Sequence, residues 1–159
     1  MKQELRLSGT GGQGLILAGI ILAEAALLDG KLAIQSQSYG PEARGGSSKS
    51  EVMISEEAIH FPKVTEPNLL LAMSQEAANK YSTDLSPESI LVTDSLFVSK
   101  LPAHTGKIYE LPITHSAKEI LGKALFANII ALGALVKITK IVSEESLVKA
   151  VLNRVPKGT

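Results

Sequence analysis

Short apolar segments alternate with longer apolar stretches along this chain, and the alternation predicts strands and helices in turn. Several short segments are continuously apolar, as in strands that are buried on both faces of a sheet. We predict strands over residues 5–8, 31–37, 47–55, 68–73, 90–93 and 107–111. The stretches 14–28 and 124–136 predict helices that are buried over most of their circumference, and an amphipathic helix follows Ser143.

Polar residues mark the ends of the predicted helices. Gly30 closes the first helix, since glycine commonly ends one. Ser74 and Ser143 have the side chain of an N-cap residue, and acidic residues follow each of them. Ser116 and Glu119 match the spacing of a capping box, which predicts the start of another helix at Ser116.

The order of these elements indicates an α/β fold. Strands that alternate with helices predict a three-layer, Rossmann-like arrangement, in which a mostly parallel sheet carries helices on both faces. The length of 159 residues suits a single domain over residues 1–159. The tail after Val155 has no capping element, which leaves open a truncation at the C-terminus.

The net charge, the absence of cysteine and the length of the apolar stretches exclude several classes of function. The formal net charge is zero, and no basic face is evident, so we expect no nucleic-acid partner. Cysteine is absent, which excludes disulfides, thiolate nucleophiles and iron–sulfur clusters held by thiolates of this chain. The apolar stretch after residue 14 is interrupted by Glu24 and is too short to span a bilayer, and no signal peptide precedes it. We therefore expect a cytoplasmic protein with no membrane partner.

A glycine-rich turn joins the first predicted strand to the first predicted helix. Residues 9–14 read G-T-G-G-Q-G, in which Gly9, Gly11 and Gly14 satisfy the spacing G-x-G-x-x-G. The N-terminus of a helix carries free N–H donors and a partial positive charge, and glycine lets a phosphate approach closely. The turn is therefore a candidate site for an anion.

Several interpretations of this turn compete. An NAD site needs an acidic residue about 20 positions further on. Residues 33–37 contain none, and Asp29 comes before the second strand, so the pattern disfavours NAD. The turn also lacks Gly-Lys-Ser/Thr and is not a nucleoside-triphosphate P-loop. The remaining alternatives are a phosphate-bearing group, a cofactor of a partner chain, or glycines needed only for close packing.

A second loop, after the second predicted strand, carries Arg44 between small residues. Arginine suits carboxylate or phosphate through paired N–H donors, and ligand loops of open α/β sheets follow strand ends. Tyr39 adds an aromatic ring and a hydroxyl to the same loop. The alternative is a structural bond from Arg44 to Glu42 or to a carbonyl within the turn.

The other polar residues indicate no catalytic machinery. The three histidines lie in separate segments without metal-ligand spacing, and no nucleophile elbow is present. Asp94 follows a strand, where a local turn bond is the favoured interpretation. Asn128, within an apolar helix, indicates a buried hydrogen bond or an interface contact. We therefore assign no catalytic residue and no metal ligand, and any demanding chemistry would depend on a cofactor held mainly by other chains.

Taken together, these segments resemble the gamma subunit of 2-oxoacid:ferredoxin oxidoreductases, over nearly the whole chain. The glycine turn alone is unspecific, but its pairing with the loop after the second strand is specific. The form S-Y-G-P-E-A-R-G-G in that loop is more similar to 2-oxoglutarate enzymes than to pyruvate enzymes. The usual C-terminal extension of the family is missing here. The matching positions are 9–14, 38–47, Ser55, Ile59, Pro62, Asp94, Ser95, Pro112, Ala117, Ala127, Asn128, Leu132 and Gly133.

The resemblance implies an enzyme of several subunits, in which this chain alone is inactive. Alpha, beta and in some cases ferredoxin-like delta subunits would hold thiamine diphosphate and the iron–sulfur clusters. The assembly would decarboxylate a 2-oxoacid oxidatively, transfer the acyl group to coenzyme A at a shared site, and reduce ferredoxin. A stand-alone nucleotide-binding module and a purely structural subunit are the alternatives. The cofactor-binding residues that the resemblance implies here are Gly9, Gly11, Gly12, Gln13, Gly14, Tyr39 and Arg44.

Overall fold

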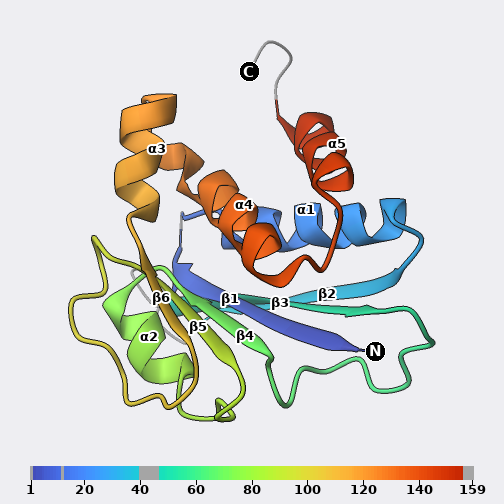
Figure 1. Cartoon of the computed structure of the whole chain (residues 1–159), viewed down its shortest axis with the longest axis horizontal. Helices are drawn as coiled ribbons and strands as arrows, with labels where there is room; N and C mark the ends of the chain where they lie inside the picture. The colour runs from blue at the N-terminus through green and yellow to red at the C-terminus, as the bar shows by residue number, and fades with distance from the viewer. Residues whose placement is uncertain (1, 12, 40–46, 156–159) are drawn as a thin grey trace.

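The computed structural model describes residues 2–11, 13–39 and 47–155, which form a six-stranded sheet covered by helices (Figure 1). The order of strands across the sheet is β2-β3-β1-β4-β5-β6. Their bounds are β1 Gln3–Thr10, β2 Leu32–Tyr39, β3 Ser47–Ser55, β4 Leu69–Ala72, β5 Ile90–Asp94 and β6 Ile108–Leu111.

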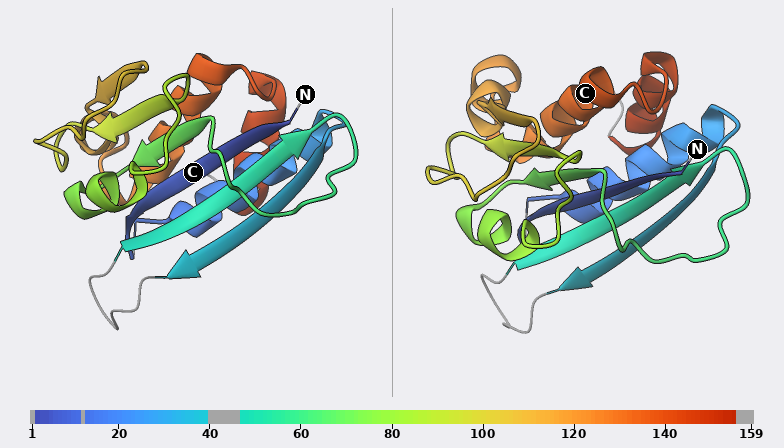
Figure 2. Two further views of the ribbon diagram at one scale, coloured as in Figure 1. Left: turned by 90° about the horizontal axis from the view of Figure 1, so that it is seen from below. Right: turned by 60° about the horizontal axis from the view of Figure 1, so that its bottom comes forward.

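The sheet is mostly parallel, as predicted. β1, β4, β5 and β6 pair parallel with one another in that order, while β3 pairs antiparallel with both β1 and β2. Figure 2 shows β2 and β3 as a long pair along one side of the sheet. Residues 40–46 join these two strands. A connection this short returns the chain antiparallel, whereas parallel neighbours need a longer crossover, so β3 is the exception to the parallel arrangement.

Helices cover both faces of the sheet, which confirms the predicted three layers. In Figure 1, α1, α3, α4 and α5 lie on one side and α2 lies on the other. No helix within the described ranges is both long enough and apolar enough to cross a membrane. The bounds are α1 Leu15–Leu28, α2 Gln75–Tyr81, α3 Ile113–Leu121, α4 Ala127–Thr139 and α5 Glu144–Arg154, with a 3-10 turn η1 at Ala124–Phe126.

The apolar character of α1 follows from its place between the sheet and two other helices. Its buried side chains, such as Ile21 and Leu22, join a core that continues into β1, β3, α4 and α5. At Gly19 an added Cβ would lie 2.1 Å from Ser50 Oγ, so the missing side chain lets α1 approach β3 closely. The polar Glu24 faces Arg154 of α5, with 3.2 Å between Oε1 and Nη2.

Most predicted helix ends agree with the structure. The hydroxyls of Ser74 and Ser143 accept hydrogen bonds from backbone N–H groups three residues on, as N-caps do. The prediction of a capping box at Ser116 is wrong, because α3 begins at Ile113 and Ser116 lies inside it. The reason is long-range: the carboxylate of Asp94, at the end of β5, accepts from the N–H of Thr114 in the first turn of α3.

Candidate functional site

The ends of β1 and β2 meet the beginning of β3 at one end of the sheet. Thr10, the last residue of β1, lies opposite Ser47, and Tyr39, the last residue of β2, lies opposite Ser48. The glycine turn follows Thr10, and residues 40–46 lie between Tyr39 and Ser47. Both segments singled out in the sequence are therefore attached to the same end of the sheet, where open α/β folds bind ligands.

Gly9 lies within β1 at a point where no side chain fits. An added Cβ would lie 2.1 Å from Gln13 Oε1, 2.7 Å from Leu15 Cδ1 and 3.0 Å from Met73 Cβ. The sequence placed the end of this strand near Ser8, but β1 continues to Thr10 because it keeps its pairing with β3. The first glycine of the motif thus serves close packing between β1, β4 and the start of α1.

Gln13 ties the glycine turn to the neighbouring strand. Its Oε1 accepts a hydrogen bond from the N–H of Thr10 at 2.7 Å, and its Nε2 donates to the carbonyl of Met73 at 3.0 Å. Met73 follows β4, the parallel neighbour of β1. Both ends of the amide therefore hold the shape of the turn, and this contact gives Gln13 a positioning role.

The start of α1 is held by a hydrogen bond from α4, and its first backbone N–H groups have no acceptor within the helix. Gly14 has a left-handed backbone, with φ of 74°, and Asn128 Nδ2 donates to its carbonyl at 3.1 Å. Asn128 is therefore the buried hydrogen-bonding group that the sequence indicated. Among the described residues no side chain caps α1, and its first turn holds no acidic residue. Such a helix start presents N–H donors and partial positive charge to an anion.

A cavity of about 220 Å³ lies beside the glycine turn. Gln13 forms one wall, and Thr114 of α3 forms another. The apolar part includes Phe97 and Leu125, whose side chains are 46% and 70% exposed. The cavity is therefore open and partly apolar, with room for part of an organic molecule or for side chains of another subunit. Its lining residues are Gln13, Phe97, Thr114, Ala124, Leu125 and Ala127.

Asp94 holds the cavity-lining residue Thr114 in place, and both of its carboxylate oxygens accept hydrogen bonds. It is fully buried at the end of β5. Its Oδ1 accepts from the N–H of Leu96 at 3.2 Å, and its Oδ2 accepts from the N–H and the hydroxyl of Thr114. The local turn bond favoured by the sequence is confirmed. The bond to Thr114 adds a second role, because it fixes the start of α3 against the end of β5.

The predicted cofactor-binding residues fall into three groups. Gly9, Gln13 and Gly14 lie together at the turn and have the contacts described above. Gly11 is exposed, and an added Cβ there would meet no atom within 4 Å, so this glycine faces open space. Gly12, Arg44 and the side chain of Tyr39 lie outside the described residues. The ligand-binding role of all seven stays a prediction.

Sequence reasoning missed the cavity wall formed by Phe97, Thr114 and Leu125. Phe97 lies in the connection between β5 and β6, where a large apolar residue was a signal that could have identified it, whereas Leu125 lies in η1. Thr114 carried no local signal, because its place beside the turn depends on the packing of α3 near β5.

The described residues at this end of the sheet have features that suit binding. Within the described ranges, no three His, Asp or Glu side chains lie together as a metal ion would require. The features gathered at this end of the sheet are a helix start with free N–H donors, a glycine exposed to solvent and a partly apolar cavity. Together they suit recognition of an anionic, partly apolar molecule.

Comparison with known proteins identifies the relatives of this chain. The family described as pyruvate ferredoxin/flavodoxin oxidoreductase matches residues 4–159. A 2-oxoglutarate synthase subunit KorC from Methanocaldococcus jannaschii is 52% identical over 162 residues, covering 100% of this chain and 87% of the relative. The KorC subunit from Methanothermobacter marburgensis is 43% identical over 166 residues, covering 100% and 89%.

A solved structure supports the same relationship. The gamma subunit of a keto/oxoacid ferredoxin oxidoreductase from Geobacter sulfurreducens is similar with a TM-score of 0.91 and 51% sequence identity. The similarity covers 99% of this chain and 87% of that one. The α/β fold predicted from the sequence is thus also the fold of this gamma subunit.

Proposed function

The chain belongs to the pyruvate ferredoxin/flavodoxin oxidoreductase family, and we propose that it completes the substrate site of an enzyme that oxidatively decarboxylates a 2-oxoacid. Its close relatives are named as subunits of 2-oxoglutarate synthase, so the chain is a gamma-type subunit of an oxidoreductase. The resemblance drawn from the sequence is confirmed. The names of these relatives, together with the S-Y-G-P-E-A-R-G-G loop, favour 2-oxoglutarate as the 2-oxoacid.

The proposed reaction converts a 2-oxoacid and coenzyme A into acyl-coenzyme A and carbon dioxide, with two electrons passed to ferredoxin and one proton released. Alpha, beta and delta-type partner subunits would hold thiamine diphosphate and the iron–sulfur clusters. The chain has no cysteine and therefore supplies no thiolate ligand to a cluster. Thiamine diphosphate, when bound in the assembly, supplies the means to stabilise the carbanion left by decarboxylation.

In this proposal, the part of the present chain is to bind and orient. The N–H donors at the start of α1 and the Arg44 guanidinium would hold phosphate or carboxylate groups of coenzyme A or the 2-oxoacid. Gln13 and Asn128 would act as positioning residues, because they hold the turn through Thr10, Met73 and Gly14. The cavity beside the turn would take an apolar part of the ligand or of a neighbouring subunit.

One observation carries the proposal beyond family membership. The glycine turn and the loop that contains Arg44 are attached to the same end of the sheet, with Thr10 directly opposite Ser47. Two segments that the sequence predicts to bind anions, and that are distant in sequence, are thereby attached to neighbouring strand ends. A stand-alone module that used the two segments for unrelated purposes would not require both of them at the same end of the sheet.

Reconstitution tests the proposal. The chain is produced alone and together with its partner subunits, and reduction of ferredoxin is followed with 2-oxoglutarate or pyruvate in the presence of coenzyme A. We expect no turnover by the isolated chain and turnover by the assembly that requires coenzyme A and is faster with 2-oxoglutarate. An assembly with the same activity whether or not this chain is present would contradict the proposal and leave the chain a structural subunit.

A further inference from the structure

A second cavity lies at the opposite end of the sheet, near the beginning of β2. Leu32, the first residue of β2, pairs with Ser55, the last residue of β3, whereas the glycine turn lies beside Ser47, the first. The cavity measures about 330 Å³ and has a floor that includes the buried Val136 and Val142. Family membership and the proposed reaction give it no role.

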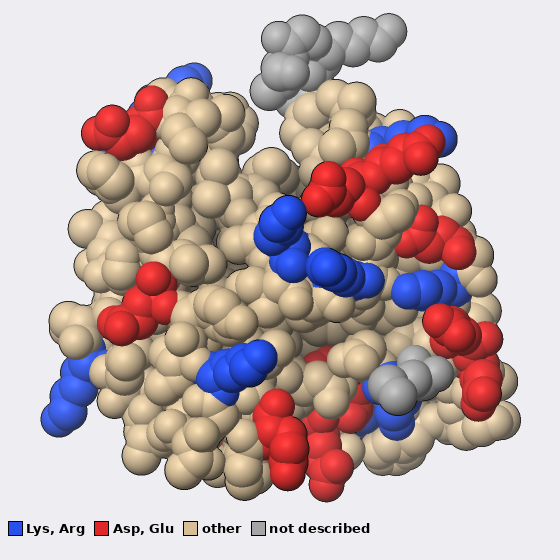
Figure 3. All heavy atoms as spheres, in the orientation of Figure 1, with Lys and Arg blue, Asp and Glu red and all other residues tan. Residues whose placement is uncertain are grey.

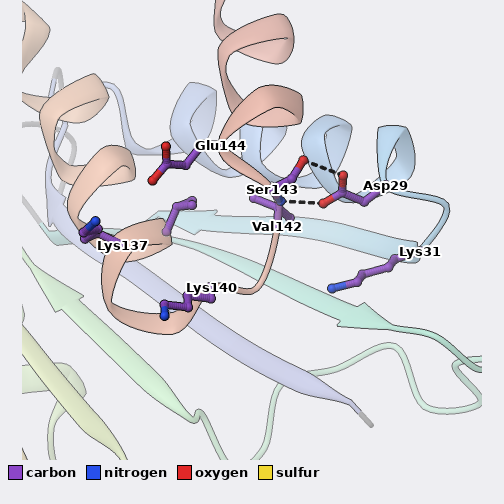
Figure 4. A pocket seen from close by; sticks show the side chains of 8 residues that line it. Asp29, Lys31, Lys137, Lys140, Val142, Ser143 and Glu144 are labelled. Carbon is purple, nitrogen blue, oxygen red and sulfur yellow. Dashed lines mark hydrogen bonds between the residues drawn. The ribbon is translucent and has the colours of Figure 1, made fainter.

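Three lysines line this cavity: Lys31, Lys137 and Lys140, which we call the lysine rim. They come from two segments that are far apart in the sequence, the start of β2 and the end of α4 (Figure 4). Figure 3 shows basic side chains across the middle of this face, with acidic side chains above and below them.

The two lysines at the end of α4 are available to a ligand. Lys137 and Lys140 are exposed, and among the described residues neither forms an ion pair with a carboxylate. Lys31 already donates a hydrogen bond to the carbonyl of Ile141 at 2.6 Å. Its ammonium group is therefore held at the cavity, with one of its three N–H donors occupied.

The acidic residues of the same cavity neutralise the lysine rim only in part: the charge of Lys31 acts on Asp29, but the hydrogen bonds of the Asp29 carboxylate are made elsewhere. Asp29 turns toward the start of α5, where Ser143 donates to it from its N–H at 2.6 Å and from its hydroxyl at 2.7 Å (Figure 4). The hydroxyl of Ser146 donates to the same carboxylate at 2.6 Å. Glu144 is exposed at the first turn of α5 and pairs with none of the three lysines. Within the lining of this cavity, three lysines against two carboxylates leave one net positive charge. Glu56 lines an adjoining cavity together with Lys31 and Lys140.

The backbone at Lys140 gives an independent reason to attribute a role to its side chain. Lys140 has φ of 53°, and among the described non-glycine residues it alone has a positive φ. It ends α4 in the left-handed conformation that glycine adopts without strain. A lysine at such a position costs stability that glycine would not, which makes its side chain a candidate for a role.

We propose that the cavity bounded by the lysine rim binds a small anion that carries more than one phosphate or carboxylate group. Lys137 and Lys140 hold the anionic groups, Lys31 adds its charge, and the valine floor contacts an apolar part of the ligand. The two ends of the sheet separate this site from the one proposed for the reaction, so a ligand bound here is distinct from the substrates of that reaction.

Calorimetric titration of the full chain in a phosphate-free buffer of low ionic strength tests this proposal. Inorganic pyrophosphate and citrate are the two probes, and they distinguish phosphate from carboxylate chemistry. We expect at least one of them to bind, and the K137Q/K140Q variant to bind it about tenfold or more weakly. The control variant K118Q/K123Q, which removes the same charge from the region of α3, should bind as the original chain does.

A second variant separates binding from structure. Lys140→Gly removes the strained side chain and should raise the melting temperature by roughly 2–4 °C while weakening the binding of the probe. The proposal is overturned if neither probe binds at millimolar concentration, or if K137Q/K140Q binds as well as the original chain. Activity of the assembled enzyme is not used in this test, so its outcome is independent of the proposed reaction.

Discussion

At the scale of single residues, Arg6 shows how a charge is kept inside the sheet. Its guanidinium is buried in β1 and contacts Glu51 Oε2 and Asp84 Oδ1, each at 2.8 Å. Burial acts to lower the pKa of Arg6, but the hydrogen bonds and charges of Glu51 and Asp84 outweigh burial and raise it. The group therefore stays charged, and Glu51 depends on it as a partner.

Arg6→Ala should lower the free energy of unfolding by about 3–5 kcal/mol, because it leaves the buried Glu51 without its main partner. Urea unfolding measures this loss. Lys49→Gln is the control, since Lys49 lies 3.5 Å from the same carboxylate but is more exposed. Its effect should stay below about 1 kcal/mol. Equal losses in the two variants would show that Arg6 is not the partner on which Glu51 depends.

Two glycines should respond in opposite ways to the same substitution. Gly9→Ala places a Cβ against Gln13, Leu15 and Met73 and should destabilise the chain by about 1–3 kcal/mol. Gly133→Ala, in α4, meets no atom within 4 Å and should stabilise it by about 0.5–1 kcal/mol. Thermal unfolding of both variants checks this, and a stable Gly9→Ala would mean that β1 and the turn are packed less closely than described.

At the scale of elements, Asp29 joins the end of α1 to the beginning of α5. Burial acts to raise the pKa of Asp29, but the hydrogen bonds from Ser146 and Ser143 and the charge of Lys31 outweigh it and place the pKa below its usual value. A carboxylate with a lowered pKa stabilises the folded state at pH values above its unfolded pKa. This stabilisation is lost as pH falls through the lower, folded value.

Asp29→Asn should therefore be less stable than the original chain at pH 7, by about 1 kcal/mol, a typical size for lost hydrogen bonds. The difference between the two should begin to shrink below about pH 4, where the carboxylate of the unfolded chain becomes protonated, and should be lost below the lower pKa of the folded state. Unfolding free energies measured from pH 7 to pH 2.5 test this. A constant difference across that range would show that the charge of Asp29 has no part in holding the start of α5.

The elements themselves were largely predictable from the sequence. Continuous apolar runs located β4 and β5, and Ser74 and Ser143 marked helix starts, because these signals are local. The start of α3 was not predictable, since Asp94 caps it from twenty residues away. The antiparallel course of β3 has no signal in its own residues, but the short connection that precedes it, residues 40–46, could have predicted it.

At the scale of the whole molecule, the sequence located the glycine turn and the Arg44 loop, and the sheet brings their attachment points together. The cavity beside the turn was not predictable, because Thr114 and Leu125 reach it only through the packing of α3 and η1. Asn128, recognised as a buried polar group, holds Gly14 across 114 positions of sequence. The sequence therefore identified residues with candidate roles, whereas the residues that each of them contacts depended on the fold.

The central claim is that this end of the sheet helps to bind the anionic substrates of the assembled enzyme. The most direct test is the steady-state kinetics of the reconstituted assembly with Arg44→Ala, with Arg154→Ala as the control because Arg154 pairs with Glu24 on α1. We predict that Arg44→Ala raises the KM for the 2-oxoacid or for coenzyme A by roughly 10- to 150-fold, equivalent to about 1.5–3 kcal/mol, while the control leaves both KM values unchanged. Unchanged KM values for both substrates in Arg44→Ala would contradict the claim.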